Sequence, residues 1–319
     1  MRIFLWALAV LVLVLALGGV VLRVAITRNG PAVLSAVDRL TGGTNGAAKL
    51  ATLSTGDHSA QKLIIWGPED RAPDSAPLPV IIFAHGGSWR TGDPEDYSFV
   101  ARALVLEGFI VVLVGYRLVK DGAPEGTYPA MIEDTARAIH RVHDEISHYG
   151  GDPDQIVLAG HSAGAYNVVM VAFERRWLAR GGHGHDALDA DALAGVVGLS
   201  GPYDFYPFDS DSTRAAFGAA LDPEATQVFN HVRGDAPPTL LIHGEKDTTV
   251  RSRNSRELAQ LIETAGGKVT LTLYPEMDHT DPLIALASPW RSRRDVARTI
   301  ARFAKQVGAR IADTADTTR

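Results

Sequence analysis

Five residues, Gly160–Gly164 with the sequence GHSAG, carry the strongest chemical signal in this chain. They follow the apolar run 155–159 and lead into a segment with a helical pattern. A serine between two glycines at such a junction is typical of a nucleophile elbow, a tight turn that exposes the hydroxyl. Glycine is needed because side chains at the flanking positions would collide with the strand and the helix. The pattern predicts Ser162 as a nucleophile, but Gly and Ser are also common in ordinary turns.

A second glycine pair could stabilise the oxyanion that nucleophilic attack on a carbonyl creates. The segment His85–Trp89, sequence HGGSW, begins where the apolar run 79–84 ends. Glycines let backbone N–H groups approach an oxyanion closely. A His-Gly-Gly segment after an early strand is the known partner of the elbow, whose own donor follows the serine. We therefore expect Gly87 and Ala163 to be the donors, with Ser88 as the alternative to Gly87. A plain Gly-Gly turn is the competing interpretation.

An acid should follow the serine in the chain, on a loop at the carboxyl end of a strand. Asp247 lies just beyond the apolar run 239–243 and is the best candidate. Aspartate is also common at helix N-caps and in surface turns. Glu245 in the same loop and Asp204 after the preceding strand are the alternatives.

A histidine should come last, and one position suits it. His279 follows the apolar run 269–274 and is the only histidine beyond His243. A single loop histidine is usually a surface residue, but here it occupies the place that the order Ser, acid, His leaves open.

Other side chains near these loops have weaker signals. Trp89, Tyr203 and Phe205 are expected to line a substrate pocket, although aromatic residues near loops are as often plain packing. The segment 183–186 (HGHD) could suggest a metal site, but it lacks further ligands and reads as a surface loop. We expect no metal ion and no organic cofactor.

These residues need a scaffold, and apolar strands alternating with amphipathic helices supply one. Such alternation predicts an α/β fold with a mainly parallel sheet and helices on both faces. Two irregular segments, 180–192 and 201–236, interrupt this alternation and are long enough to form a lid or pocket wall. The expected strands are Leu63–Trp66, Pro79–Ala84, Phe109–Val114, Gln155–Ala159, Gly195–Leu199, Thr239–His243 and Val269–Tyr274. The expected helices are Tyr97–Glu107, Ala130–Tyr149, Ala165–Leu178, Arg253–Thr264 and Ser292–Val307.

Composition limits the class of protein. The 319 residues are 46% hydrophobic, which suits one large domain with a short appendage. The net charge of −6, without a basic stripe, argues against nucleic acid as a partner. The absence of cysteine excludes disulfides, thiolate metal sites and a cysteine nucleophile.

The N-terminus predicts attachment to a membrane. Residues 3–22 are apolar or small, and about 20 such residues span a bilayer as a helix. A cleaved signal peptide, which would leave a secreted or periplasmic protein, is the alternative. We expect a single-pass anchor over 1–28, a linker over 29–48, a catalytic domain over 49–308 and a flexible tail over 309–319. Flanking arginines barely determine the orientation; the extracytoplasmic side is favoured for the domain.

Taken together, the motifs resemble those of the α/β-hydrolase superfamily. The resemblance rests on the segments just described, on 115–118 (GYRL), on Gly244-x-x-Asp247 and on Asp278-His279. It covers about residues 50–307. Within the superfamily the chain is similar to bacterial carboxylesterases related to hormone-sensitive lipase, in the branch with feruloyl-esterase-like and kynurenine-formamidase-like enzymes. Ser88 departs from the lipase-type pattern, which often has a third glycine there.

The resemblance implies a serine hydrolase that cleaves esters of small to medium acyl groups through an acyl-enzyme. Ser162 would attack, His279 would carry the proton, and Asp247 would orient the imidazole. The partner would be a small-molecule ester or amide. An amidase, formamidase or peptidase with the same triad is the first alternative, and a non-catalytic binding protein of the same fold is the second.

Overall fold

The computed structural model describes residues 24–26, 28–43, 45–72, 74–120, 124–179, 188–190 and 193–317. None of the helices within these ranges has the length and apolar character needed to cross a bilayer. The predicted anchor, residues 3–22, lies outside the described ranges.

One eight-stranded sheet runs through the molecule in the order β1-β2-β4-β3-β5-β6-β7-β8. The strands from β4 through β8 are paired in parallel, whereas β1 and β2 join antiparallel at one edge. This confirms the predicted mainly parallel sheet. The strands are β1 Ala47–Ser54, β2 Lys62–Pro68, β3 Leu78–Ala84, β4 Ile110–Val114, β5 Gly151–His161, β6 Gly195–Leu199, β7 Thr239–Gly244 and β8 Val269–Tyr274.

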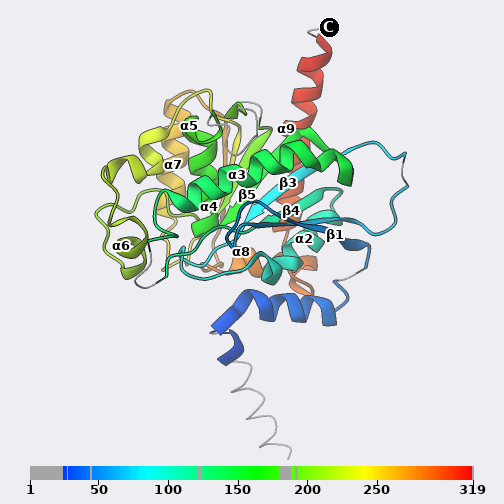
Figure 1. Cartoon of the computed structure of the whole chain (residues 1–319), viewed down its shortest axis with the longest axis horizontal. Coiled ribbons are helices and arrows are strands. Elements are labelled where there is room, and N and C mark those ends of the chain that lie inside the picture. The colour runs from blue at the N-terminus through cyan, green and yellow to red at the C-terminus, as the bar shows by residue number, and fades with distance from the viewer. Residues whose placement is uncertain are drawn as a thin grey trace, which may run out of the picture.

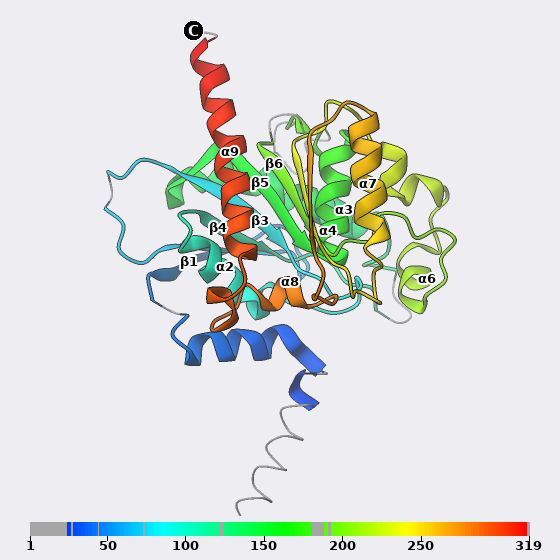
Figure 2. The same ribbon diagram turned by 180° about the vertical axis from the view of Figure 1, so that it is seen from behind.

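Helices cover both faces of the sheet, as Figures 1 and 2 show from opposite sides. The central strands are apolar throughout because successive side chains point to opposite faces and both faces are buried. In β4, for example, Val112 faces one core cluster and Val111 the other. The first cluster includes side chains of α3, α4 and α7, and the second those of α2, α8 and α9. The helices are α2 Ser98–Val105, α3 Ala130–Glu145, α4 Ala163–Phe173, α5 Arg176–Ala179, α6 Asp211–Phe217, α7 Arg253–Thr264, α8 Asp281–Ile284 and α9 Val296–Thr317.

The predicted linker over 29–48 is wrong in its secondary structure. Residues 28–40 form a helix below α2 and α8 in Figure 1, and β1 begins at Ala47. The Asn29 side chain accepts a hydrogen bond from the Ala32 N–H (3.1 Å), and Pro31 falls in the first turn, where proline is tolerated. Contacts with the domain hold the helix: the Asp38 carboxylate accepts a hydrogen bond from Arg102 Nε (2.6 Å), with both side chains buried.

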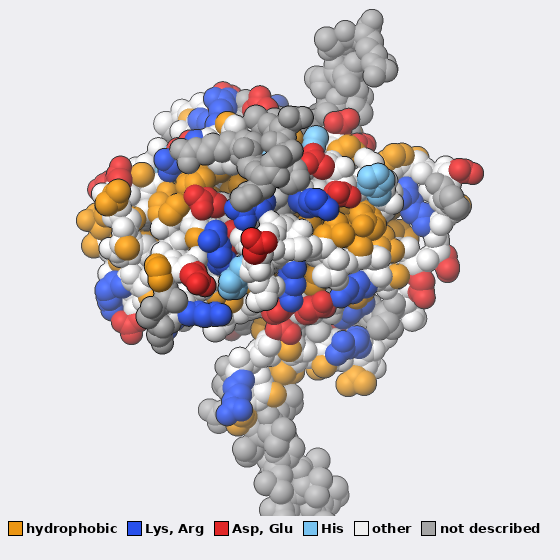
Figure 3. Space-filling view, in the orientation of Figure 1, with side chains coloured by type: hydrophobic (Ala, Val, Ile, Leu, Met, Phe, Trp, Pro, Cys, Tyr) orange, Lys and Arg blue, Asp and Glu red, His pale blue; other side chains and the backbone are white. Residues whose placement is uncertain are grey.

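Several boundaries differ from the expectation, and two of these differences concern whole segments. The predicted helix over 165–178 divides into α4 and α5, because Glu174 adopts an extended backbone conformation between them. The predicted flexible tail is helical in its described part, since α9 continues to Thr317 and projects from the body in both views. On the face shown in Figure 3, acidic and basic side chains are interspersed with hydrophobic patches.

Candidate active site

Ser162 occupies the turn between β5 and α4. Its backbone angles, φ 53° and ψ −121°, are unusual for a residue other than glycine and mark a strained turn. The Ser162 N–H donates to the carbonyl of Leu199 on β6 (2.9 Å). A Cβ at Gly164 would collide with the carbonyl oxygens of Ala84 and His85, so only glycine lets α4 approach the end of β3 this closely. The chain is thus folded so that the serine side chain lines a cavity at the carboxyl ends of the strands.

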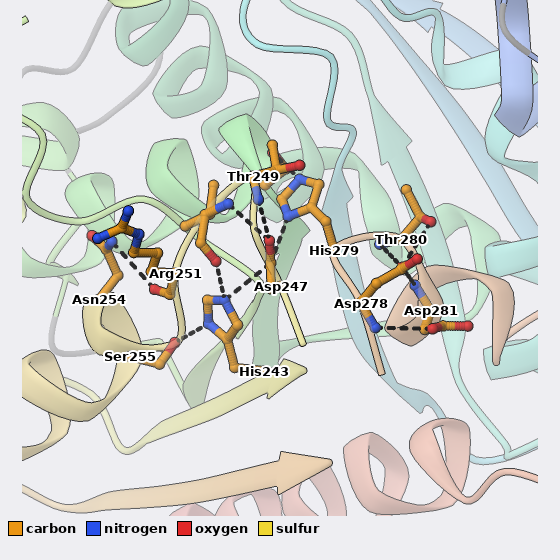
Figure 4. A network of polar contacts seen from close by, with 12 residues as sticks. His243, Asp247, Thr249, Arg251, Asn254, Ser255, Asp278, His279, Thr280 and Asp281 are labelled. Atoms are coloured by element: carbon orange, nitrogen blue, oxygen red, sulfur yellow. Dashed lines mark hydrogen bonds and ion pairs between the residues drawn. The ribbon is translucent and has the colours of Figure 1, made fainter. Parts of the chain in front are cut away.

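The structure brings the three predicted triad residues into hydrogen-bonding distance. His279 Nε2 lies 3.0 Å from Ser162 Oγ. On the other side of the ring, His279 Nδ1 lies 2.7 Å from Asp247 Oδ2, as Figure 4 shows. Asp247 follows β7 and His279 follows β8, so neighbouring parallel strands deliver both side chains to one edge of the sheet. The side chain of Asp247 is fully buried, whereas that of His279 is 13% exposed. An imidazole held between a hydroxyl and a carboxylate can take the hydroxyl proton.

The surroundings of Asp247 keep its carboxylate ionised. Its Oδ1 accepts the backbone N–H groups of Thr249 (2.9 Å) and Val250 (2.8 Å). Its Oδ2 faces His279 Nδ1 and also His243 Nε2, at 3.1 Å. Burial alone would raise the pKa of Asp247, but the hydrogen bonds from His243 and His279 outweigh it and hold that pKa well below its usual range. The two alternative acids lie elsewhere: Glu245 pairs with Arg256, and Asp204 lines the cavity.

The glycine-rich loop after β3 forms one rim of the cavity. Gly87 has φ 120°, a conformation that favours glycine, and its carbonyl accepts the N–H groups of Arg90 and Thr91 (both 3.0 Å). Ser88 and Trp89 also have positive φ values, 52° and 59°. Among the described residues, the backbone N–H groups of Gly87, Ser88 and Ala163 find no protein acceptor. Ser88 and Ala163 line the cavity together with Ser162, so two residues with unused N–H donors border the space next to the nucleophile.

Two buried histidines support this arrangement. The His85 ring stacks on Tyr116 at a centroid distance of 4.5 Å, and burial lowers the pKa of His85 to about 4. His161, at the variable position of the elbow, lies with Nε2 3.0 Å from the backbone carbonyl of His279. Burial and then the charge of His279 lower the pKa of His161 to about 3. His161 is therefore neutral at neutral pH and donates to that carbonyl, which ties the nucleophile turn to the histidine loop.

The contact of His161 with His279 and that of His243 with Asp247 were not predicted from the sequence. A histidine within the elbow, and another four residues before the acid, were the only available signals. Neither pattern by itself indicates where the ring points.

The cavity next to Ser162 has a volume of about 890 Å³. Trp89 and Phe205, two of the three predicted pocket residues, form an aromatic part of its wall, and the Trp89 ring nitrogen donates to Asn167 Oδ1 (3.0 Å). Tyr203 is fully buried and does not line the cavity, so its predicted place in the wall is wrong. Residues 248–251, 253 and 254 also line the cavity and bring Arg251 and Arg253, while Asp204 and Asp209 add carboxylates.

No grouping of three or more His, Asp or Glu side chains suited to a metal ion occurs in the described part of the chain. The segment 183–186 lies outside it.

Comparison with known proteins places the chain among esterases and their relatives. Esterase LipQ of Mycobacterium tuberculosis is 31% identical over 287 residues, which cover 83% of this chain and 65% of that protein. A probable isoprenylcysteine alpha-carbonyl methylesterase of Arabidopsis thaliana is 28% identical over 257 residues, 75% of this chain and 52% of the relative. A kynurenine formamidase of Danio rerio is 27% identical over 231 residues, with coverages of 70% and 72%. The chain spans about half to two thirds of the length of the first two relatives.

Solved structures share the architecture. Esterase B from Lactobacillus rhamnosis matches with a TM-score of 0.73 at 19% identity, covering 93% of this chain and 98% of that one. At this identity the likeness shows the fold, which is that of the α/β-hydrolases. The family model BD-FAE matches residues 69–262, more than half of the chain, and the matched range includes Ser162 and Asp247. The chain therefore belongs to the BD-FAE family of α/β-hydrolase, carboxylesterase-like proteins.

Proposed function

We propose that this protein is a serine hydrolase that cleaves carboxylic esters of small to medium acyl groups. The observation that carries the proposal is the continuous chain of hydrogen bonds from Ser162 Oγ through the His279 ring to Asp247 Oδ2, at 3.0 and 2.7 Å. The strained turn at Ser162 and the unused N–H donors around the same cavity support it. The esterase relatives favour an ester as substrate.

Acylation of Ser162 is the first step. Ser162 Oγ attacks the ester carbonyl carbon while its proton passes to His279 Nε2, and the positive ring is stabilised by Asp247. The oxyanion accepts hydrogen bonds from the N–H of Ala163 and from that of Gly87, or of Ser88 in its place. When the tetrahedral intermediate collapses, the alkoxy group leaves with the proton from His279. The acyl group remains as an ester of Ser162.

Hydrolysis of the acyl-enzyme then restores the serine. A water molecule gives a proton to His279 Nε2 as its oxygen attacks the acyl carbon, in the same oxyanion site. Collapse of this second intermediate releases the carboxylic acid and returns the proton to Ser162 Oγ.

The direct test measures turnover and labelling of the full chain in detergent. With p-nitrophenyl acetate as substrate and a fluorophosphonate as probe, we expect wild type to turn over and to be labelled at Ser162. Ser162→Ala should lose both, with the fold unchanged by circular dichroism. Labelling that persists in Ser162→Ala, or a wild type that hydrolyses no ester in a panel of short acyl, long acyl and feruloyl esters, would refute the proposal.

Hydrolysis of amides or formamides by the same triad is a second candidate. The kynurenine formamidase of Danio rerio, of which the match covers 72%, is the observation that favours it. Because the leaving group is selected by the shape and polarity of the pocket, parallel assays with N-formylkynurenine and matched p-nitrophenyl esters separate the two. A kcat/KM for the formamide above that for every ester would replace the ester proposal.

We also propose that residues 3–22 anchor the protein in a membrane with a single helix. Their apolar character and length support this. Fractionation of cells that express the full chain tests it: a spanning helix should resist salt and alkaline carbonate and yield to detergent. Release by high salt alone, or a soluble product that begins after residue 22, would contradict it.

A further inference from the structure

The carboxylate of Asp247 accepts a hydrogen bond for which the triad does not account. Its Oδ2 lies 2.7 Å from His279 Nδ1 and also 3.1 Å from His243 Nε2 (Figure 4). His243 lies on β7, four residues before the acid, and its side chain is fully buried. It does not line the cavity and cannot contact a substrate there.

The neighbours of His243 determine where its ring carries hydrogen. Nε2 is also 2.8 Å from the carbonyl oxygen of Val250. A carbonyl and an ionised carboxylate can only accept, so Nε2 must hold a hydrogen and share it between them. Nδ1 lies 2.7 Å from Ser255 Oγ on α7, which donates to it when the ring is neutral. The network thus assigns the Nε2–H tautomer.

These contacts limit the motion of the acid. The Val250 N–H donates to Asp247 Oδ1, and the Val250 carbonyl accepts from His243. The His243 ring thus contacts both ends of the turn over 247–250. Both carboxylate oxygens are therefore held by groups that are fixed on the sheet or in the turn. The direction of Oδ2 toward His279 is therefore constrained from β7 through His243, in addition to its contact with His279 itself.

We propose that His243 is a positioning residue for catalysis: its Nε2–H holds Oδ2 of Asp247 in the direction that orients His279. This rests on the proposed hydrolase function. A buried histidine that only fills space would tolerate any polar side chain of similar size. A positioning histidine needs a donor at the place of Nε2, because orientation errors near a reacting group are costly to the rate.

Two amide variants separate these possibilities. His243→Gln can place its amide N–H near the position of Nε2, whereas His243→Asn is too short to reach Asp247. In p-nitrophenyl acetate turnover we expect the Gln variant to stay within about threefold of wild-type kcat. The Asn variant should lose about 10- to 100-fold in kcat, with KM within about twofold. Fluorophosphonate labelling of Ser162 should slow in the same ratio, because it uses the same proton transfer.

Equal kcat in the Gln and Asn variants, or a loss carried by KM, would overturn the proposal. A wild type without ester turnover would instead refute the hydrolase function. If neither variant folds, ¹⁵N spectra of the wild-type histidine rings decide, with His243 assigned through its shift in Ser255→Ala. The Nε2–H tautomer supports the proposal, and the Nδ1–H tautomer overturns it.

Discussion

Asp247 is the residue on which the polar contacts of the site converge. Backbone N–H groups hold one carboxylate oxygen, and the rings of His243 and His279 face the other. Because the donors are distributed over both carboxylate oxygens, the side chain has one orientation in which every donor is satisfied. It also makes the residue sensitive to the smallest possible change, from carboxylate to amide.

Asp247→Asn should abolish most of the activity without unfolding the protein. The amide oxygen must take the place of Oδ1, where it meets the N–H groups of Thr249 and Val250. The amide NH₂ then points at His279 Nδ1, which can accept only if the ring hydrogen moves to Nε2. A ring in that tautomer cannot take the proton of Ser162, so we expect kcat for p-nitrophenyl acetate to fall about 10³- to 10⁴-fold.

Glu245→Gln is the matched control for this change. Glu245 lies in the same loop but pairs with Arg256 at the surface, so its variant should keep wild-type kcat. An Asp247→Asn protein within tenfold of wild type, or an equal loss in both variants, would contradict the role of Asp247.

At the scale of elements, the site depends on loops that follow different strands and are tied together. His161 at the end of β5 donates to the backbone of the loop after β8, and Tyr116 after β4 donates to the His85 carbonyl after β3 (2.8 Å). The glycine-rich loop itself is shaped by the turn at Gly87. A substitution in that turn should therefore impair activity by displacing N–H donors.

Gly87→Ala should reduce kcat strongly, and the reduction should exceed what backbone strain alone causes. A Cβ at this position would collide with the backbone of Thr91, and φ 120° is unfavourable for alanine. The loop must shift, and the loss of an oxyanion donor typically costs about 10²- to 10³-fold in kcat.

Gly108→Ala is the control for backbone strain. Gly108 also has a positive φ, 95°, but nothing lies within 4 Å of its added Cβ. This variant should lose about 1 kcal/mol of unfolding free energy and keep its kcat. Steady-state kinetics and urea unfolding of both variants provide the comparison. Wild-type kcat in Gly87→Ala would show that this turn does not shape the oxyanion site.

On the scale of the whole molecule, the helix over 28–40 is joined to distant parts of the chain through Asp38. The buried carboxylate accepts hydrogen bonds from Arg102 Nε on α2 (2.6 Å) and from the Ser288 N–H (2.7 Å). Asp38→Ala leaves the Arg102 charge buried without its partner. We expect the free energy of unfolding in urea to fall by about 3 to 5 kcal/mol.

Lys49→Ala tests whether the loss of unfolding free energy in Asp38→Ala arises because that ion pair is buried. Lys49 forms an ion pair with Glu95 (2.8 Å) in which both side chains are more than one third exposed. Its removal should cost less than about 1 kcal/mol, since water screens such pairs. Similar losses in the two variants would mean that the Asp38 pair does not secure the helix.

The buried histidines also make stability depend on pH. Burial lowers the pKa from 6.5 to about 4 in His85 and to about 3 in His161. As pH falls below about 6.5, the unfolded chain binds protons at these rings that the native protein does not. The free energy of unfolding must then decrease on acidification, by a slope that approaches about 1.4 kcal/mol per pH unit for each ring.

Urea unfolding between pH 6.5 and pH 5 checks this slope. Asp247 adds little in that window, because a carboxylate with a lowered pKa loses its contribution mainly at more acidic pH. In His161→Gln the free energy of unfolding should depend less steeply on pH than in wild type, because one fewer ring takes up a proton on unfolding. Identical slopes in the two proteins would contradict a native His161 that stays neutral.

Local pattern was sufficient for much of the fold. Gly195–Leu199, Arg253–Thr264 and Val269–Tyr274 have the predicted bounds, because an apolar strand or an amphipathic helix is encoded by neighbouring residues. The helix over 28–40 and the strand Ala47–Ser54 were not predicted. Their residues have weak local preferences, and contacts such as Asp38 with Arg102 join positions 64 residues apart.

The candidate site, like the fold, could be predicted from the sequence only in part. The sequence by itself determined the candidates Ser162, Asp247 and His279, because strand-end motifs in a fixed order are a property of the chain. Only the tertiary structure decided that Asp247, and neither Glu245 nor Asp204, meets His279, and that His161 and His243 contact the pair. It also placed Tyr203 in the core. The physical reason is that a hydrogen bond between loops depends on where separate strands end in space, which no local pattern encodes.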